Sequence, residues 1–202
     1  MKITDLEPQK KRKDRVNLYV DNEFIAGLEI TTAARLGFFI GKEVTSTDLN
    51  MLEGEEEYQK CLDKAFGLIS RRLQSERELW QKLGKSCEKP TIGRVLDRLR
   101  ELGYANDEQF TEMWVRERKQ SRGKKLLNQE LIQKGISKDT IAKYLSEINP
   151  DDENEVALRL ARRKYKKELD SEDNYQRVSG LLARKGYNYS TIKTVLDILK
   201  SE

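Results

Sequence analysis

The sequence predicts a mainly α-helical chain, in which three tandem three-helix units follow a small N-terminal module that contains a β-hairpin. The first observation is composition: 37% of the 202 residues are hydrophobic and 37% are charged. Helices that each bury a single apolar stripe suit this balance better than one thick core does, and they predict an elongated, modular chain. The second observation is that 12 glycines and 3 prolines are too few for a long disordered or all-β chain. The third is an internal repeat, described below.

The N-terminal module is predicted to span residues 1–54, and its clearest feature is the stretch "RVNLYVDNEFIAGLEI". Apolar and polar residues alternate in residues 16–20, which is the pattern of a half-buried strand, and residues 24–30 read as a second strand. Between them, "DNE" is a turn candidate in which Asn22 can adopt a positive φ. Together these features predict a β-hairpin.

Shorter elements are expected after the hairpin. The stretch "TTAARLGF" predicts a short helix with Gly37 as its end, and "GKEV" predicts a third short strand. A longer helix is expected to begin in "TSTDLNMLE", with Ser46 or Thr47 as its N-terminal cap.

From residue 55 onward, the sequence reads as helical blocks separated by short turns, and these blocks repeat. Leu131 and Gly135 are matched 51 positions later by Leu182 and Gly186. The earlier block fits with small shifts, so the repeat predicts units at 55–105, 106–149 and 150–202, each with three helices. Units of this size bury little apolar surface alone, and neighbouring units are therefore expected to pack on one another.

Three helix ends share one pattern, in "LRELGY", "LIQKGI" and "LARKGY". An apolar residue is followed four positions later by glycine and then by another apolar residue, which is typical of the Schellman helix end. The pattern predicts a left-handed conformation at Gly103, Gly135 and Gly186. It also predicts contacts across the three helix ends between Leu99 and Tyr104, Leu131 and Ile136, and Leu182 and Tyr187.

The stretch "GYANDEQFTEMWVRER", residues 103–118, joins the first two units. Asn106 is predicted to cap the helix that follows, with Gln109 able to reach back to it. Phe110, Met113 and Trp114 then fall on one helix face. We therefore expect Trp114 to pack in the core, since a tryptophan that stacks on bases would sit exposed beside basic residues.

Basic residues gather in "VRERKQSRGKK" and "RLARRKYKK", with a smaller pair in the first unit. Cations near helix C-termini favour the helix dipole and keep a surface soluble, which is one interpretation of them. The other is a set of positive patches for an acidic protein surface or for phosphates. The candidate binding residues are Arg71, Arg72, Arg116, Arg118, Lys119, Arg122, Lys124, Lys125, Arg162, Arg163, Lys166 and Lys167.

Catalysis and cofactor binding are not predicted. Without histidine the chain has no imidazole base, and its two cysteines cannot form a structural zinc site alone. The "GKS" at residues 84–86 lacks the earlier glycine of a phosphate-binding loop. The cysteines favour a reducing compartment, and no apolar stretch approaches the roughly 20 residues of a membrane helix, so a cytoplasmic protein without membrane contact is expected.

Several of these segments resemble the RecX family of bacterial recombination regulators. The family's Ser-x-x-Glu-Leu pattern is matched by Ser75, Glu78 and Leu79. The Gly-Tyr, acidic turn, Phe and Trp-Val-x-x-Arg pattern is matched by Gly103, Tyr104, Asp107, Phe110, Trp114, Val115 and Arg118. Glu130, Leu131, Lys134, Gly135 and Ile136 match a third element. Asn106 replaces the usual acidic residue, but asparagine caps a helix equally well.

The resemblance implies tandem three-helix units and a role in DNA recombination, DNA repair and the SOS response. RecX-like proteins bind the RecA recombinase, lodge in the groove of its filament on DNA, and restrain its ATPase and strand exchange. Weak DNA binding within that groove, a monomer and the absence of enzymatic activity are expected in turn.

A hypothesis from the basic runs is that Arg116, Arg118, Lys119, Arg122, Arg163 and Lys167 contact acidic surface or DNA phosphate in that groove. The alternative is an independent DNA-binding module, since three-helix units can resemble helix-turn-helix domains. Preference for RecA-coated over bare DNA would distinguish the two, because the alternative predicts tight, salt-dependent binding to bare duplex.

Overall fold

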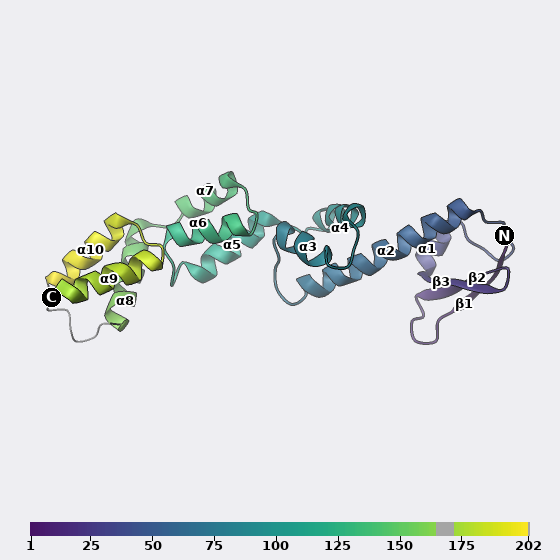
Figure 1. The fold of residues 1–202 in the computed structure, drawn as a ribbon, viewed down its shortest axis with the longest axis horizontal. Helices are drawn as coiled ribbons and strands as arrows, with labels where there is room; N and C mark the ends of the chain where they lie inside the picture. Colours follow the sequence, from purple (N-terminus) through teal and green to yellow (C-terminus); the bar gives the residue numbers. More distant parts are fainter. Residues whose placement is uncertain (165–171, 202) are drawn as a thin grey trace. The chain divides into compact units, whose positions relative to one another are not determined.

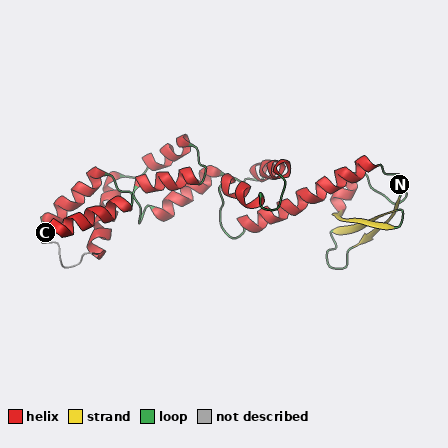
Figure 2. Ribbon diagram, viewed as in Figure 1, coloured by secondary structure: helices red, strands yellow, loops and turns green. Residues whose placement is uncertain are grey.

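A computed structural model describes residues 1–164 and 172–201. The described chain is mainly helical, with one three-stranded sheet near the N-terminus (Figure 2), which confirms the predicted fold class. It divides into two compact units, one of residues 1–67 with 83–97 and the other of residues 68–82 with 98–202. The contacts below all lie within one unit or the other.

The sheet of the first unit is antiparallel and has the order β1-β2-β3. Its strands are β1 (Ile3–Pro8), β2 (Arg15–Val20) and β3 (Glu23–Glu29). The predicted hairpin is β2 and β3, and its turn places Asp21 at φ 49° and Asn22 at φ 66°. Two successive positive φ angles match the right-handed twist of a tight hairpin, so the prediction for Asn22 is confirmed.

The third strand was predicted in the wrong place. It is β1, whereas "GKEV" forms no strand and contributes one isolated bridge, between Glu43 and Lys2. Gly41, at φ 96°, turns the chain there, and its N–H donates to the carbonyl of Ile3. The local pattern hides β1 because Thr4, Asp5 and Glu7 are polar and Asp is a poor strand residue.

Helix α1 (Ile30–Arg35) follows the sheet, and Gly37 ends this segment at φ 64°, as predicted. Helix α2 (Ser46–Ile69) begins one residue after its cap, which is Thr45 and not Ser46 or Thr47. Asp48 decides this, because its N–H donates to Thr45 Oγ1 at 3.2 Å and its carboxylate accepts from Thr45 N at 2.8 Å. Helix α2 runs unbroken through residues 54 and 55, where a domain boundary was predicted.

The remaining helices follow α2 along the chain and are described here in three groups (Figure 1). The first group is completed by α3 (Glu76–Leu83) and α4 (Lys89–Glu101). The second contains α5 (Asp107–Arg118), α6 (Lys124–Gln133) and α7 (Lys138–Ser146). The third contains α8 (Pro150–Lys164), α9 (Glu172–Arg184) and α10 (Tyr189–Lys200). We refer to these groups as repeats 1, 2 and 3.

Repeats 2 and 3 each have a buried apolar cluster. In repeat 2 it includes Leu127, Leu131 and Ile141, and in repeat 3 it includes Val178, Leu182 and Val195. Each helix contributes one apolar stripe, as the composition predicts.

The three Schellman helix ends are confirmed in the backbone. Gly103, Gly135 and Gly186 have φ of 75°, 86° and 84°. The N–H of the following residue donates across each helix end to the predicted apolar residue, over 2.8, 3.1 and 3.1 Å respectively. Leu131 and Ile136 share one buried cluster, and Leu182 and Tyr187 share another, whereas Tyr104 remains 48% exposed.

Candidate functional site

Trp114 is the centre of a dense set of side-chain contacts in repeat 2. It is half-buried against the apolar cluster rather than fully inside it, which corrects the prediction of a core tryptophan. One stacking partner is Phe110, whose ring centroid lies 5.4 Å away, and another is the guanidinium of Arg118, 3.6 Å from the indole centroid. The indole Nε1 donates to Glu130 Oε2 at 2.9 Å. Trp114 therefore fixes the side chains around it and has little free surface for a base.

Glu130 holds two of the predicted binding residues. Arg122 forms an ion pair with its carboxylate, and Arg118 Nε lies 3.7 Å from Glu130 Oε2. Burial, followed by repulsion from Arg118, lowers the pKa of Arg122. The two arginines are thus part of the internal structure around α6, in keeping with the structural interpretation of this basic run.

Arg72 is held in a similar way, by Glu78. Its guanidinium donates to both carboxylate oxygens of Glu78, each at 3.0 Å, and Lys134 pairs with the same carboxylate. Burial acts to raise the pKa of Glu78, but hydrogen bonds from Arg72 and Lys134 outweigh it and bring the pKa to about 2. Glu78 is only 8% exposed, so its charge depends on these two cations.

The Ser-x-x-Glu motif has a local role and a long-range one. Glu78 N donates to Ser75 Oγ at 3.2 Å and Ser75 N donates to Glu78 Oε2 at 3.4 Å, which is the reciprocal capping box at the start of α3. Ser75 Oγ also donates to the backbone carbonyl of Lys134 at 2.7 Å. The end of α6 therefore docks on the beginning of α3. We refer to this contact between repeats 1 and 2 as the first joint.

A second joint repeats this arrangement between repeats 2 and 3. The N–H of Gly123 donates to the carbonyl of Lys185 at 2.9 Å, and the N–H of Lys125 donates to the carbonyl of Gly186 at 3.0 Å. The end of α9 thus docks on the beginning of α6. At both joints, the carbonyl groups at one helix C-terminus accept hydrogen bonds from donors at the N-terminus of a helix in the preceding repeat, which satisfies groups that helix ends leave free.

Each joint also has a carboxylate that caps the second helix of the preceding repeat. At the first joint, Glu76 N donates to Asp107 Oδ1 at 2.9 Å, and at the second, Lys124 N donates to Glu153 Oε1 at 3.0 Å. Asp107 and Glu153 both lie in the first turn of the first helix of the following repeat. Burial raises the pKa of Asp107. Lys124 is anchored further, because its Nζ donates to the carbonyl of Ile148 at 2.8 Å.

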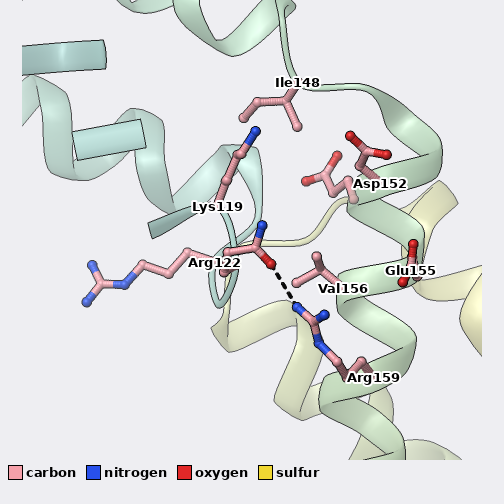
Figure 3. Close-up of a pocket in the computed structure, with 9 residues that line it drawn as sticks. Lys119, Arg122, Ile148, Asp152, Glu155, Val156 and Arg159 are labelled. Carbon is pink, nitrogen blue, oxygen red and sulfur yellow. Dashed lines mark hydrogen bonds between the residues drawn. The ribbon is translucent and has the colours of Figure 1, made fainter. Parts of the chain in front are cut away.

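A hollow of about 240 Å³ opens beside the second joint (Figure 3). Figure 3 shows the acidic side chains of Asp152 and Glu155 on its α8 wall and Arg122 pointing away from it. Arg159 donates to Gln120 Oε1 at 2.8 Å across the hollow. Since Lys119 faces a wall that carries carboxylates, the charges in this hollow largely balance one another.

Five of the predicted binding residues stay exposed and have no side-chain ion pair or hydrogen bond within the described residues. They are Arg71, Arg116, Lys119, Lys125 and Arg163. Arg162 is exposed as well. Lys166 and Lys167 lie outside the described residues. The basic runs therefore separate into cations that join elements of the fold and cations that face solvent.

Sequence reasoning missed the acidic partners of these cations. Glu78 and Lys134 are 56 positions apart and meet only through the first joint. The capping pattern at Ser75 was a usable signal for Glu78, but nothing local connects it to Lys134. Trp114 and Glu130 lie on two different helices, and their spacing follows no helical period.

Comparison with known proteins places the chain in a family. Models of four RecX domains match in order along it: the RecX N-terminal domain at 1–45, and the first, second and third three-helix domains at 61–99, 106–145 and 151–196. A regulatory protein RecX of Clostridium tetani is 34% identical over 203 residues, covering 98% of this chain and 94% of its own length. The chain belongs to the RecX family.

Further RecX relatives agree with this assignment. A regulatory protein RecX of Clostridioides difficile is 34% identical and covers 98% of this chain and 95% of its own length. A crystal structure of a regulatory protein RecX superposes with a TM-score of 0.81 at 24% identity, covering 100% of this chain and 99% of that chain. A crystal structure of RecX from Lactobacillus salivarius gives a TM-score of 0.65 at 22% identity, covering 73% of this chain and 99% of that chain.

Membership in the RecX family makes this chain a regulatory protein and not an enzyme. Within the part of the chain that the structure describes, no helix has the length and apolar character to cross a membrane.

Proposed function

We propose that this protein binds the RecA recombinase on DNA, lodges in the groove of the RecA filament, and restrains its ATPase and strand exchange. The observation that carries the proposal is the match to RecX proteins over nearly the whole chain, at 34% identity across 98% of it. Models of the family's N-terminal domain and of its three three-helix domains match in order along the chain, which supports the proposal further.

The exposed cations of repeats 2 and 3 support this proposal. Arg116, Lys119, Lys125 and Arg163 face solvent without internal partners in the described structure. Exposed cations of this kind steer a protein toward an acidic surface or a phosphate backbone. The chain carries a net charge of only +4, which suits contacts in a groove better than unaided binding to duplex DNA.

Cations with internal partners attract a distant acidic surface or phosphate backbone less strongly than the exposed cations do. Arg72, Arg118, Arg122 and Lys124 already interact with Glu78, Glu130 or the Ile148 carbonyl. Reversal of charge at Arg118 or Arg122 would therefore disturb repeat 2 itself. We propose instead that the partner-contacting surface consists of the exposed cations Arg116, Lys119, Lys125 and Arg163.

The first experiment compares RecA-coated DNA with bare DNA. RecA is loaded on single-stranded DNA with ATP, the protein is titrated in, and both ATP hydrolysis and co-sedimentation are measured. We expect inhibition of hydrolysis and binding that is far stronger to the coated DNA. Tight, salt-dependent binding to bare duplex without inhibition would instead favour the alternative, an independent DNA-binding module.

The second experiment tests the surface with the double variant Arg116→Glu and Lys119→Glu. Both residues are exposed, so circular dichroism should report unchanged helix content while inhibition of the RecA ATPase weakens by about tenfold or more. Lys193→Glu, on an exposed position of α10 outside the basic runs, is the matched control and should behave like the unaltered protein. Equal inhibition by the double variant would exclude this surface.

A further inference from the structure

A second hollow, of about 360 Å³, lies at the first joint beside Trp114. Its walls come from the segment between α2 and α3, from α5 and from the end of α6. Leu73, Phe110 and Met113 supply apolar surface, and Arg72, Arg118 and Lys134 supply cations. None of the solvent-facing cations of the proposed RecA-contacting surface lines it.

In this hollow the cations are the more exposed side chains, and the carboxylates that pair with them are the more buried ones. Glu78 and Glu130, which pair with the cations, have side chains that are only 10% and 16% exposed. Arg72, Arg118 and Lys134 keep 48%, 30% and 25% of their side-chain surface exposed. A molecule that enters the hollow thus meets positive charge above an apolar floor, even though each cation already has an internal partner.

The contacts that Trp114 already makes argue against a nucleobase as the ligand of this hollow. Phe110 and Arg118 stack on its ring, and Lys134 Nζ lies 4.9 Å from the ring centroid. The indole N–H of Trp114 already donates a hydrogen bond to Glu130. A nucleobase needs a free aromatic face to stack on, and this ring does not offer one.

The hollow at the second joint provides an internal comparison. It is also formed by a segment between two helices of one repeat and by the first helix of the next, but that helix carries Asp152 and Glu155 on the wall (Figure 3). Three cations and three carboxylates line it, whereas Glu117 is the one acidic residue among those that line the hollow beside Trp114. Of the two hollows, the one at the first joint therefore has the excess of cations over acidic side chains on its walls.

We propose that the hollow beside Trp114 is a docking site for a polypeptide segment in which an acidic side chain adjoins an aliphatic one. The aliphatic group would pack on Leu73 and Met113, and the carboxylate would lie between Arg72 and Lys134. Charge complementarity selects the acidic residue, because buried carboxylates already fix the cations in place. The inference rests on the proposed function insofar as the segment would belong to the regulated protein partner.

The test uses the full chain and a fluorescein-labelled peptide of alternating glutamate and leucine. A peptide with glutamine in place of glutamate serves as the matched probe. Trp80→Phe removes the other tryptophan, so that the emission of Trp114 reports on the hollow. We expect the acidic peptide to change this emission and to bind at least about tenfold more tightly than its glutamine counterpart.

Two further variants, each made in the Trp80→Phe protein, test which side chains of the hollow control binding of the peptide. Met113→Glu places a negative charge on the half-buried floor and should weaken binding of the acidic peptide by about tenfold. Glu117→Gln removes the acidic residue of the rim, which is 59% exposed, and should tighten binding a few-fold without endangering the fold. Equal affinity for the two peptides, or no response to Glu117→Gln in a folded protein, overturns the proposal.

A labelled oligothymidylate is the third probe. Binding of this probe that competes with the peptide and exceeds it in affinity would make the hollow a nucleic-acid site and would also overturn the proposal. Failure of the docking-site proposal can be distinguished from failure of the proposed function. If the Met113→Glu protein inhibits the RecA ATPase as well as the unaltered protein does, the proposed function stands and the docking site is excluded. If the acidic peptide binds but the protein has no effect on RecA, the docking site stands and the proposed function is excluded.

Discussion

Gly123 packs directly on the backbone of Gly186. A Cβ atom at Gly123 would lie 2.5 Å from the carbonyl carbon and oxygen of Gly186 and from the nitrogen of Tyr187. The φ of Gly123 is −79°, which any residue can adopt, so it is the space and not the backbone conformation that requires glycine here. The contact lets the N–H of Gly123 reach the carbonyl of Lys185 and closes the second joint.

Gly123→Ala is therefore expected to open or strain the second joint. The added methyl group meets backbone atoms that cannot rotate away, and overpacking of this kind costs typically about 1–3 kcal/mol. We expect repeat 3 to lose its docking on repeat 2 while each retains its own apolar cluster. Urea unfolding should show a lower midpoint, and hydrogen exchange at Lys125 N should accelerate. Unchanged exchange at Lys125 would contradict this account of the joint.

Gly93→Ala tests the opposite case. Gly93 lies inside α4, and a Cβ atom there would meet nothing within 4 Å. Alanine restricts the unfolded chain and favours the helix, so we expect a gain of roughly 0.5–1 kcal/mol in the free energy of unfolding. Urea denaturation gives the measurement. The pair Gly93→Ala and Gly123→Ala should thus change stability in opposite directions, although both make the same chemical change.

Local sequence patterns predicted the helices well because the signals are themselves local. Gly103, Gly135 and Gly186 adopt the left-handed conformation that the Schellman pattern requires, and Asn106 accepts hydrogen bonds from Glu108 N and Gln109 N as a cap does. Each of these effects acts within a few residues of the chain. They depend little on what the rest of the molecule does.

Features that depend on distant residues were not predictable in the same way. The carboxylate of Glu78 selects Arg72 and Lys134 from among many cations, and only the fold of the first joint brings Lys134 near. Trp114 was expected in the core because its spacing is that of an apolar stripe. The partners Arg118 and Glu130 hold it at the boundary instead, and periodicity carries no information about hydrogen-bond partners on another helix.

Asp107 offers a test of how the first joint uses a carboxylate. Its Oδ1 accepts from Glu76 N at 2.9 Å, but burial raises its pKa, so the negative charge at neutral pH costs some stability. Asp107→Asn keeps the acceptor and removes the charge, and we expect it to be at least as stable as the unaltered protein at pH 7. Asp107→Ala removes the acceptor and should cost about 1 kcal/mol. Thermal unfolding of both variants measures the difference, and equal losses for the two would show that the charge itself matters.

The stability of Asp107→Asn relative to the unaltered protein should change with pH in a predictable direction. Because the pKa of Asp107 is raised in the folded state, the folded protein holds this proton more tightly than the unfolded chain does. The cost of the charge therefore disappears as the pH falls through the raised pKa. The advantage of Asp107→Asn should be largest near pH 7 and vanish under acidic conditions.

Glu78 should behave in the opposite way. Glu78→Gln leaves Arg72 and Lys134 without a counter-charge in a site where the carboxylate is 8% exposed, and removal of one partner from such a cluster costs roughly 3 kcal/mol. Glu101→Gln is the matched control, because Glu101 pairs with Arg98 at 2.9 Å on an exposed surface and should matter very little.

The stability that Glu78 contributes should disappear in acid over a defined interval. Its pKa is lowered from 4.5 to about 2 by folding, so the contribution is complete above pH 4.5 and is lost as the pH falls toward 2. Urea denaturation of the unaltered protein and of Glu78→Gln, at several pH values between 7 and about 2.5, should thus give curves that converge as the pH falls. A gap in unfolding free energy that stays constant over this interval would mean that Glu78 stabilises the first joint by its shape or by neutral hydrogen bonds, and not by its charge.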